Sequence, residues 1–377
     1  MSSSLSFRSL VSVSALLAGC SQSAEPPYSG IPSAETWKVI AESADPTVSA
    51  GQASAASDGR TAAVAYIETD TARVVMQRFD AKGERIGSLV VLGSDPDLHS
   101  IVSLASDGKQ YAACWNTAPE VHCSLVDEQG QVRLNALAIS GQDATIVGTA
   151  TGWAVAYAGD QKTVRLQALT SNLAADRKFI DLRLYAHFNT HDQGPLFAST
   201  PSGYALVARD AEDGEASLSR LDSDLMPTGS AIPLGHPLSY SGQLVATDTR
   251  AVVSLSAAYG SYLLLMDSQK LTGELAIGGG GKTGNDQALA LTAGGIGAAW
   301  LDPEGTVQQR FLADGHDSDI GLDHRSNDLL ALEEEATDSY QRLLLVDHQT
   351  LLLAKSQRYG TLTGTSALRV ATLKFHE

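Results

Sequence analysis

The chain has little positive charge and few cysteines. It contains 26 lysine and arginine residues against 43 aspartate and glutamate residues, 3 cysteines, and a formal net charge of −17. Its lysines and arginines form no cluster along the sequence. Because binding to phosphate groups requires clustered cations, this acidic balance disfavours nucleic acid and anionic lipid headgroups as partners. We interpret the acidic surplus as an aid to solubility.

The apolar run near the N-terminus is short. It extends from Leu10 to Ala18 and follows Arg8, the one charged residue before it. Such a run cannot span a bilayer as a helix, because a spanning helix needs about 20 apolar residues. A short apolar run behind a positive residue is typical of a targeting segment that is removed from the mature protein.

The run ends in Leu17-Ala18-Gly19-Cys20, which resembles a bacterial lipobox. This resemblance implies that cleavage occurs before Cys20 and that its sulfur and its new amino group are acylated, which anchors the protein in a membrane. Ser21 stands where an aspartate often retains lipoproteins at the inner membrane, so we expect the outer membrane of a Gram-negative cell envelope. The alternative is an ordinary secretory signal with a chance cysteine.

The rest of the chain divides into two parts. Residues 20–36 are rich in Ser, Pro and Ala without apolar periodicity, which predicts a flexible tether behind a signal peptide at 1–19. From residue 37 to residue 377 the pattern is one of strands and turns, with no stretch of helical period.

A degenerate unit of about 46 residues occurs seven times in this second part. Each unit opens with a short strand that carries a small residue: Ala55–Ser57, Leu104–Ser106, Gly148–Ala150, Phe197–Ser199, Val245–Thr247, Leu289–Leu291 and Leu330–Leu332. A turn follows at Asp58-Gly59, Asp107-Gly108, Thr151-Gly152, Ser202-Gly203, Thr249-Arg250, Gly294-Gly295 and Asp338-Ser339. An apolar second strand is centred on Ala65, Cys114, Ala156, Val207, Ser254, Ala299 and Leu345.

A third strand and a more polar fourth strand complete each unit. We therefore predict an all-β fold, a seven-bladed β-propeller with four-stranded antiparallel blades, or six blades if the last unit is not a blade. The last unit lacks a clear glycine turn near Ser339. Because ring closure removes open sheet edges, we expect the strand near Trp37–Ile40 to pair with the last blade beside Leu368–Phe375.

The repeat of turns and aromatic residues, over roughly residues 45–377, resembles the propeller-type lipoproteins of Gram-negative, notably myxobacterial, bacteria. The resemblance implies the propeller fold, and most such proteins have no assigned activity. The Trp-Asp ending of WD40 blades is absent from the sequence. The Ser-x-Asp-x-Gly-x-Thr-Trp box of sialidase propellers is absent too, which argues against a glycosidase.

Two cysteines follow the lipobox, Cys114 and Cys123. A two-residue turn at Ala118-Pro119 would place them directly opposite each other on one side of a hairpin, within reach of a bridge. The compartment beyond the inner membrane is oxidising, so we predict a structural disulfide. The alternatives are two free buried thiols, or a metal site, which is disfavoured because His122 points to the opposite face.

Polar residues recur just before the first strands. His99, Asp143, Ser241 and Asp286 lie nine residues before the turn positions 108, 152, 250 and 295, and Asp97, Asp192 and Asp328 lie near the corresponding place. In a propeller this place is the mouth of the central channel, where a ring of Asp and His could bind a cation or sugar hydroxyls. The alternative is that these residues serve turn chemistry.

Asp317, Asp319 and Asp323 alternate around Gly321, a spacing that calcium loops use. The glycine is one place early and no bidentate glutamate follows, so a solvated acidic turn is the favoured interpretation. We therefore predict no cofactor. If the chain does bind one, calcium is the candidate.

The sequence contains no Gly-x-Ser-x-Gly elbow and no Cys/His dyad pattern. We therefore expect a non-enzymatic, membrane-anchored envelope lipoprotein whose propeller binds a protein or a glycan. The alternative is a polysaccharide hydrolase or lyase that uses the axial Asp/His ring, since such carboxylate pairs leave no sequence spacing.

Overall fold

The computed structural model describes most of the chain from residue 38 onward. The described residues are 38–42, 53–68, 71–80, 82–96, 102–160, 163–176, 179–185, 195–210, 215–236, 241–257, 260–279, 287–292, 295–301, 307–313, 325–327, 336–347, 350–359 and 366–374. All regular secondary structure in these ranges is β-strand, and none of it is a helix fit to cross a membrane. The predicted signal peptide, Cys20 and the tether lie outside the described residues.

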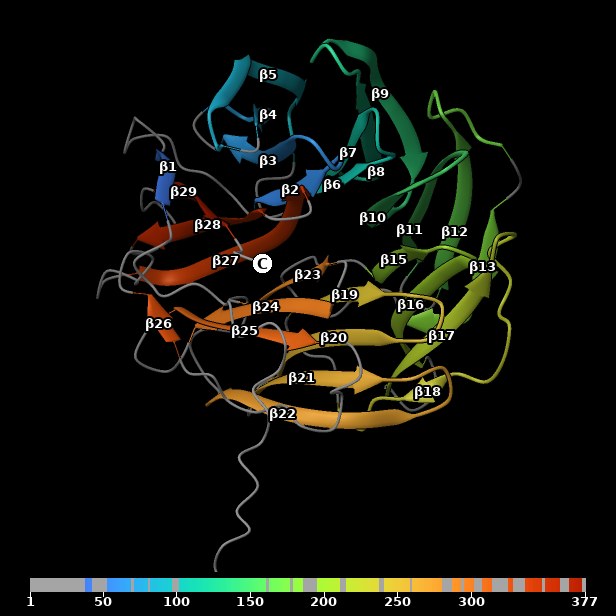
Figure 1. Ribbon diagram of the computed structural model, residues 1–377. Helices are drawn as coiled ribbons and strands as arrows, with labels where there is room; N and C mark the ends of the chain where they lie inside the picture. Colours follow the sequence, from blue (N-terminus) through green and yellow to red (C-terminus); the bar gives the residue numbers. More distant parts are fainter. Residues whose placement is uncertain are drawn as a thin grey trace, which may run out of the picture.

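The strands form antiparallel sheets around a common axis (Figure 1). In the described part of the chain there are seven sheets, six with four strands and one with five. The first strand of each sheet contacts the first strand of the next sheet, and the last sheet contacts the first, so that these contacts close a circle. The propeller fold and its four-stranded antiparallel sheets are therefore confirmed, while the number of blades stays a prediction.

Each sheet is built outward from the axis. The strands next to the axis are β2 (Ser54–Ser57), β6 (Ser103–Ser106), β10 (Gln142–Thr149), β15 (Leu196–Thr200), β19 (Ser241–Ala246), β23 (Gln287–Thr292) and β27 (Ala336–Asp347). The second strands are β3 (Ala62–Glu68), β7 (Tyr111–Thr117), β11 (Gly152–Asp160), β16 (Gly203–Asp210), β20 (Ala251–Ala257), β24 (Gly295–Leu301) and β28 (Thr350–Tyr359).

The outer half of each sheet follows the same order. The third strands are β4 (Arg73–Phe79), β8 (Glu120–Val126), β12 (Thr163–Thr170), β17 (Ala216–Asp222), β21 (Gly260–Met266), β25 (Val307–Ala313) and β29 (Ser366–Lys374). The outermost strands are β5 (Arg85–Ser94), β9 (Val132–Ser140), β13 (Ile180–Leu182), β18 (Ile232–Pro233), β22 (Leu271–Gly279), β26 (Arg325–Asn327) and β1 (Lys38–Glu42). The short β14 (Leu184–Tyr185) also pairs with β16.

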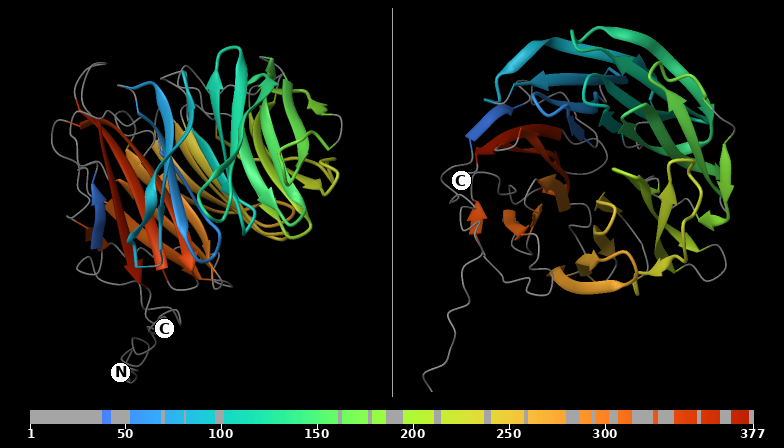
Figure 2. Two further views of the ribbon diagram at one scale, coloured as in Figure 1. Left: turned by 90° about the horizontal axis from the view of Figure 1, so that it is seen from above. Right: turned by 45° about the vertical axis from the view of Figure 1, so that its right-hand side comes forward.

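The two ends of the described chain share one sheet. β1 pairs antiparallel with β29, with Lys38 opposite Thr372 and Glu42 opposite Arg369, as the sequence predicted (Figure 2). The assignment of the last unit was wrong, because Asp338 and Ser339 lie inside β27 and form no turn. The predicted second strand around Leu345 is instead part of this innermost strand. The reason is that β1 supplies the outermost strand, so the C-terminal segment needs only three strands of its own.

The second strand β3 is apolar up to its last residue because both of its faces are covered. Every residue of β3 is buried, whereas the outermost strand β5 of the same sheet is mostly exposed. The core lies between neighbouring sheets: Ile67 and Met76 of the first sheet pack in one cluster with Tyr111 and Trp115 of the second. Burial of a side chain of this size stabilises the fold by about 1.5–3 kcal/mol.

Recurrent aspartates fix the turns between strands. The Oδ1 atom of Asp58 accepts hydrogen bonds from the backbone N–H groups of Arg60 and Thr61, at 2.8 and 2.6 Å. The same double contact recurs at Asp80, Asp107, Asp127, Asp222 and Asp267. An aspartate side chain that binds backbone N–H groups two to four residues ahead stabilises a tight turn. These repeated acidic residues therefore have a structural role.

Neighbouring first strands approach so closely that one position requires glycine. A Cβ atom added to Gly148 of β10 would lie 1.9 Å from the carbonyl oxygen of Ser106 in β6. We predict that Gly148→Ala lowers the free energy of unfolding by about 1–3 kcal/mol, because the two sheets must move apart. Urea denaturation measures the change. Gly229→Ala is the matched control, since a Cβ there meets no atom within 4 Å, and an equal loss in both variants would contradict this account.

The turn aspartates make stability sensitive to acid. Hydrogen bonds from the backbone N–H groups of Gln269 and Lys270 hold the pKa of Asp267 below its usual value of 3.8. At Asp58, burial raises the pKa of the carboxyl. Hydrogen bonds from Thr61 and Arg60 together lower the pKa by more than burial raises it, so the net shift is downward. A depressed carboxyl pKa means that the unfolded chain binds more protons than the folded chain.

We predict that the free energy of unfolding contains a contribution that is fully present above about pH 4 and is lost as the pH falls through the folded-state pKa values. Urea denaturation at a series of pH values between 7 and 2.5 measures it. A double variant with Asp58→Asn and Asp267→Asn keeps the acceptor oxygens without the titration, so its acid loss should be smaller. An identical acid profile in the variant would contradict the assignment.

Candidate functional site

A cavity of about 350 Å³ lies among the first strands. Its wall comes from β2, β6, β10, β15, β19 and β23, so it is the central channel of the propeller. Polar side chains on this wall include Ser54, Ser103, Asp143, Thr145 and Gln243. The sequence analysis predicts a binding site at the mouth of this channel. The contacts of these side chains show whether they are available to a ligand.

Two serines on the wall join neighbouring sheets. The Ser54 hydroxyl oxygen accepts a hydrogen bond from the backbone N–H of Leu104 in the next sheet, at 3.1 Å. One sheet further, the Ser103 hydroxyl oxygen accepts from the N–H of Ile146 at 3.0 Å. The first strand of a sheet has one edge without a strand partner, and its N–H groups need acceptors when they are buried. The serines meet this requirement.

Side-chain bonds to the next sheet also occur further around the channel. Thr145 donates its hydroxyl to the carbonyl oxygen of Pro195 at 2.7 Å, and the Oε1 atom of Gln243 accepts from the N–H of Leu289 at 3.0 Å. Four polar side chains on the described wall thus bind the backbone of the next sheet. They hold the ring together, and this role uses at least one hydrogen-bonding atom of each.

Asp143 is the one residue of the predicted Asp/His ring that the structure describes, while the backbone of Ser241 begins β19. Asp143 lies in β10 at an irregularity of the β10–β11 register between Gln142 and Thr145. Its backbone is in the left-handed region, with φ of 54°, a conformation that Asp and Asn tolerate better than most residues. Only 5% of the residue is exposed. The bulge places the carboxylate on the channel wall.

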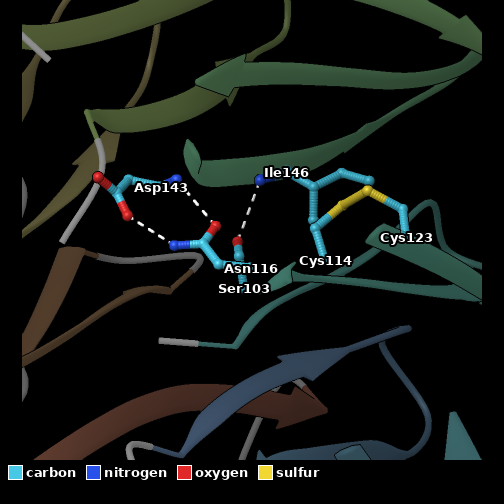
Figure 3. Close-up of a disulfide and its surroundings, with 6 residues drawn as sticks. All are labelled: Ser103, Cys114, Asn116, Cys123, Asp143 and Ile146. Atoms are coloured by element: carbon cyan, nitrogen blue, oxygen red, sulfur yellow. Dashed lines mark hydrogen bonds between the residues drawn. A yellow bond between two sulfur atoms is a disulfide. The ribbon is translucent and has the colours of Figure 1, made fainter. Parts of the chain in front are cut away.

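A reciprocal pair of hydrogen bonds holds Asp143 against Asn116 (Figure 3). The Nδ2 group of Asn116 donates to Oδ1 of Asp143 at 2.7 Å, and the backbone N–H of Asp143 donates to Oδ1 of Asn116 at 2.9 Å. Asn116 lies on β7 and is itself buried. The pair therefore joins the second and third sheets and fixes the direction of the carboxylate.

Cys114 and Cys123 form a disulfide directly behind this part of the wall (Figure 3). The two residues lie opposite each other in the β7–β8 pair, in the register that the sequence predicted, and both are fully buried. Ser103 lies opposite Cys114 in the β6–β7 pair. The disulfide thus ties β7, which carries Asn116 and pairs with the strand of Ser103, to β8.

The other predicted site residues lie outside the described residues. They are Asp97, His99, Asp192, Asp286 and Asp328 of the axial ring, and Asp317, Asp319 and Asp323 of the calcium-like loop. The axial ring and the calcium site therefore stay predictions. Within the described ranges, no group of three or more His, Cys, Asp or Glu side chains is placed to hold a metal ion.

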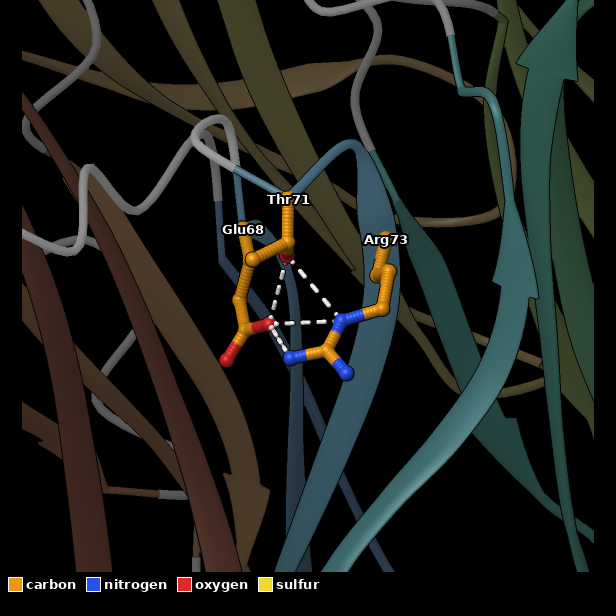
Figure 4. Close-up of polar contacts among 3 residues, drawn as sticks. All are labelled: Glu68, Thr71 and Arg73. Atoms are coloured by element: carbon orange, nitrogen blue, oxygen red, sulfur yellow. Dashed lines mark hydrogen bonds and ion pairs between the residues drawn. The ribbon is translucent and has the colours of Figure 1, made fainter.

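A buried carboxylate away from the predicted ring was missed by the sequence analysis (Figure 4). Glu68 is 6% exposed, pairs with Nη2 of Arg73 at 2.6 Å and accepts a hydrogen bond from Thr71 at 2.8 Å. Burial, and next the charge of Glu68, raise the pKa of Tyr66. Glu68 and Arg73 end the two strands of one hairpin, so their opposite charges were a usable signal. The cluster fixes the β3–β4 connection.

The serines of the channel wall also had a signal in the sequence. Ser54 and Ser103 each lie five residues before the turn glycines Gly59 and Gly108. This signal is confined to the first two units, because Val147, Ala198, Val245 and Ala290 stand at the same place in the next four. Asn116 had no such signal, because its partner Asp143 belongs to another sheet and lies 27 residues away.

No protein-family model matches the chain, and no curated protein matches it significantly. Solved structures do. Hsv2 of Kluyveromyces lactis, with complete loop 6CD, superposes with a TM-score of 0.52 at 10% identity, over 86% of this chain and 98% of that one. A protein of unknown function from Dyadobacter fermentans superposes with a TM-score of 0.50 at 10% identity, over 90% of this chain and 100% of that one. At these identities the similarity shows the fold alone.

Proposed function

We propose that the chain is a membrane-anchored lipoprotein of the cell envelope, held in the outer membrane of a Gram-negative bacterium. Its propeller binds a protein or a glycan and catalyses no reaction. The lipobox at Leu17–Cys20 supports the anchor. The observation that favours a binding module over an enzyme is that four polar side chains of the described channel wall bond neighbouring sheets together, which leaves Asp143 as the one ionisable group on that wall.

Catalysis requires titratable groups that converge on a substrate with their protonation state poised for the reaction. On the described channel wall the only ionisable side chain is Asp143, and Asn116 fixes it. Propellers also carry loops at both ends of their strands, and loops on a rigid scaffold are the usual place for recognition. A binding module therefore agrees with the channel better than an enzyme does.

The anchor is tested by Cys20→Ser in a Gram-negative host that is fed an alkyne analogue of palmitate. We predict that the wild-type chain is labelled and sediments with outer membranes, and that the variant is unlabelled and accumulates as the precursor. Ser21→Asp is the matched control, since it keeps the acylated cysteine and should move the labelled protein to the inner membrane. Label on the Cys20→Ser variant, or none on the wild type, would overturn the anchor.

The position of Asp143 on the channel wall supports a second candidate function. In this alternative the protein is a polysaccharide hydrolase or lyase whose axial carboxylate acts as an acid or base. A cavity of about 350 Å³ has the volume of a small ligand site.

Asp143→Asn separates the two functions. Asparagine keeps the acceptor oxygen for Asn116 and tolerates positive φ, so the free energy of unfolding should change by less than about 0.5 kcal/mol. Asp143→Ala lacks the acceptor and should lose about 1–3 kcal/mol. For a binding module we expect no release of reducing ends or unsaturated products from a polysaccharide panel. Turnover by the wild type that disappears in the folded Asp143→Asn variant would replace the proposal with the enzyme.

A further inference from the structure

A second cavity, of about 500 Å³, lies between the fourth and fifth sheets. Its wall combines four connections, which are β15–β16 and β17–β18 of the fourth sheet and β19–β20 and β21–β22 of the fifth. All of its lining residues belong to the described part of the chain. We call this cavity the inter-sheet groove; it shares no lining residue with the central channel.

The lining of the inter-sheet groove is almost entirely polar. Of its 12 lining residues, only Leu221 and Gly229 lack a polar side-chain group. Six of the others carry hydroxyls, one carries an amide, two are aspartates and one is an arginine. A ligand in this groove therefore meets both hydrogen-bond donors and acceptors over its whole surface, and an apolar ligand gains little there.

Arg220 of β17 has donors that the folded chain does not use. Its Nη1 group donates to the carbonyl oxygen of Thr247 in the next sheet, while Nε and Nη2 are buried without a partner among the described residues. Arg78 occupies the equivalent strand of the first sheet, where its guanidinium faces the ring of Tyr111 at 5.9 Å and only Nε is buried without a partner. Unpartnered buried donors are rare and call for an acceptor.

Asp248 stands one place after the position that Asp58 has in its turn, because the N–H of Thr247 and the N–H of Asp58 each donate to the carbonyl oxygen three residues ahead. In the β2–β3 turn the carboxylate of Asp58 accepts from its own turn, but that of Asp248 accepts from the N–H and the hydroxyl of Ser202 in the neighbouring sheet, at 2.9 and 2.7 Å. Thr247 takes over the turn contact by accepting from the N–H of Arg250. Asp248 is therefore turned toward the groove wall as an acceptor.

The charges of the groove disfavour an anion. Asp222 and Asp248 stand against the single cation Arg220. Hydrogen bonds from the hydroxyls of Ser202 and Thr200 hold the pKa of Asp248 below its usual value, so it is ionised at neutral pH. A phosphate or a uronate would meet two carboxylates here, whereas a neutral polyol meets acceptors for its hydroxyl protons and donors for its oxygens.

We infer that the inter-sheet groove binds a neutral, hydroxyl-rich saccharide through Arg220, Asp248 and the surrounding hydroxyls. This inference rests on the proposed binding function and selects its glycan branch. A protein partner is the poorer fit, because hot spots in protein interfaces are aromatic or other large side chains buried in well-packed pockets, and this lining is polar. The volume of about 500 Å³ accommodates a short oligosaccharide.

Gly229 allows the groove to be blocked without disturbing the fold. It is a lining residue, and a Cβ there would meet no atom within 4 Å. A tryptophan at this position should enter open space. Ser268→Trp introduces the same bulk from the opposite wall, where the residue is exposed. Gln129→Trp is the matched control, because Gln129 is exposed in the corresponding connection of the second sheet, between β8 and β9.

The test is binding of the full chain in detergent to immobilised neutral oligosaccharides of glucose, galactose, mannose and N-acetylglucosamine, with uronate oligosaccharides as the acidic set. We expect the wild type to bind at least one neutral member and none of the acidic set more tightly. Gly229→Trp and Ser268→Trp should each weaken that binding at least tenfold. Gln129→Trp should stay within twofold of the wild type, and urea denaturation should confirm that all three variants are folded.

Three outcomes would overturn the inference, and they have different meanings for the proposed function. If a neutral saccharide binds and both groove variants bind it equally well, the glycan site lies elsewhere and the binding function stands. If the uronate set binds more tightly, the charge argument is wrong. If no saccharide binds but crosslinking on intact envelopes captures a protein, the protein branch of the proposed function stands and the groove inference falls.

Discussion

The pairing of β1 with β29 is the interaction on which the ring depends. β1 comes from the beginning of the described chain and completes the sheet that β27, β28 and β29 form from its end. Each sheet covers the faces of its two neighbours, so a loosened last sheet would uncover the first sheet and the sixth as well. Small sheets are unstable in water unless their apolar faces are packed. Closure therefore makes the stability of every sheet depend on one strand pair.

Closure also dictates what lies at the axis. It places the free edges of the first strands around the channel, where buried N–H groups need acceptors. Ser54, Ser103 and Gln243 supply them from one sheet to the next. Polar residues at the axis are thus required by the fold before any ligand is considered. The recurrence of polar residues near the first strands is for this reason weak support for a catalytic ring, and Asp143 with its partner Asn116 fits the same pattern.

The features that could be predicted from the sequence are those set by local geometry. A two-residue turn and the two-residue period of a strand fixed Cys114 opposite Cys123, and buried second strands appeared as continuous apolar runs. The predicted strands of the last unit were assigned one place too far out in the sheet. The reason is that the outermost strand of this sheet comes from the other end of the chain. Contacts between sheets, such as that of Arg220 with Thr247, join residues 27 apart in different units and have no fixed spacing to detect.

The degeneracy of the repeat is itself informative about function. Where a unit has an aspartate at the turn between its first two strands, as at Asp58 and Asp107, the carboxylate is bound to its own turn. In the fifth unit Thr247 performs that task, and the adjacent Asp248 reaches the neighbouring sheet. Asp248 stands where the first two units have Gly59 and Gly108. The departure occurs in the same groove where Arg220 has unpartnered donors, so two independent deviations from the repeat coincide at one place.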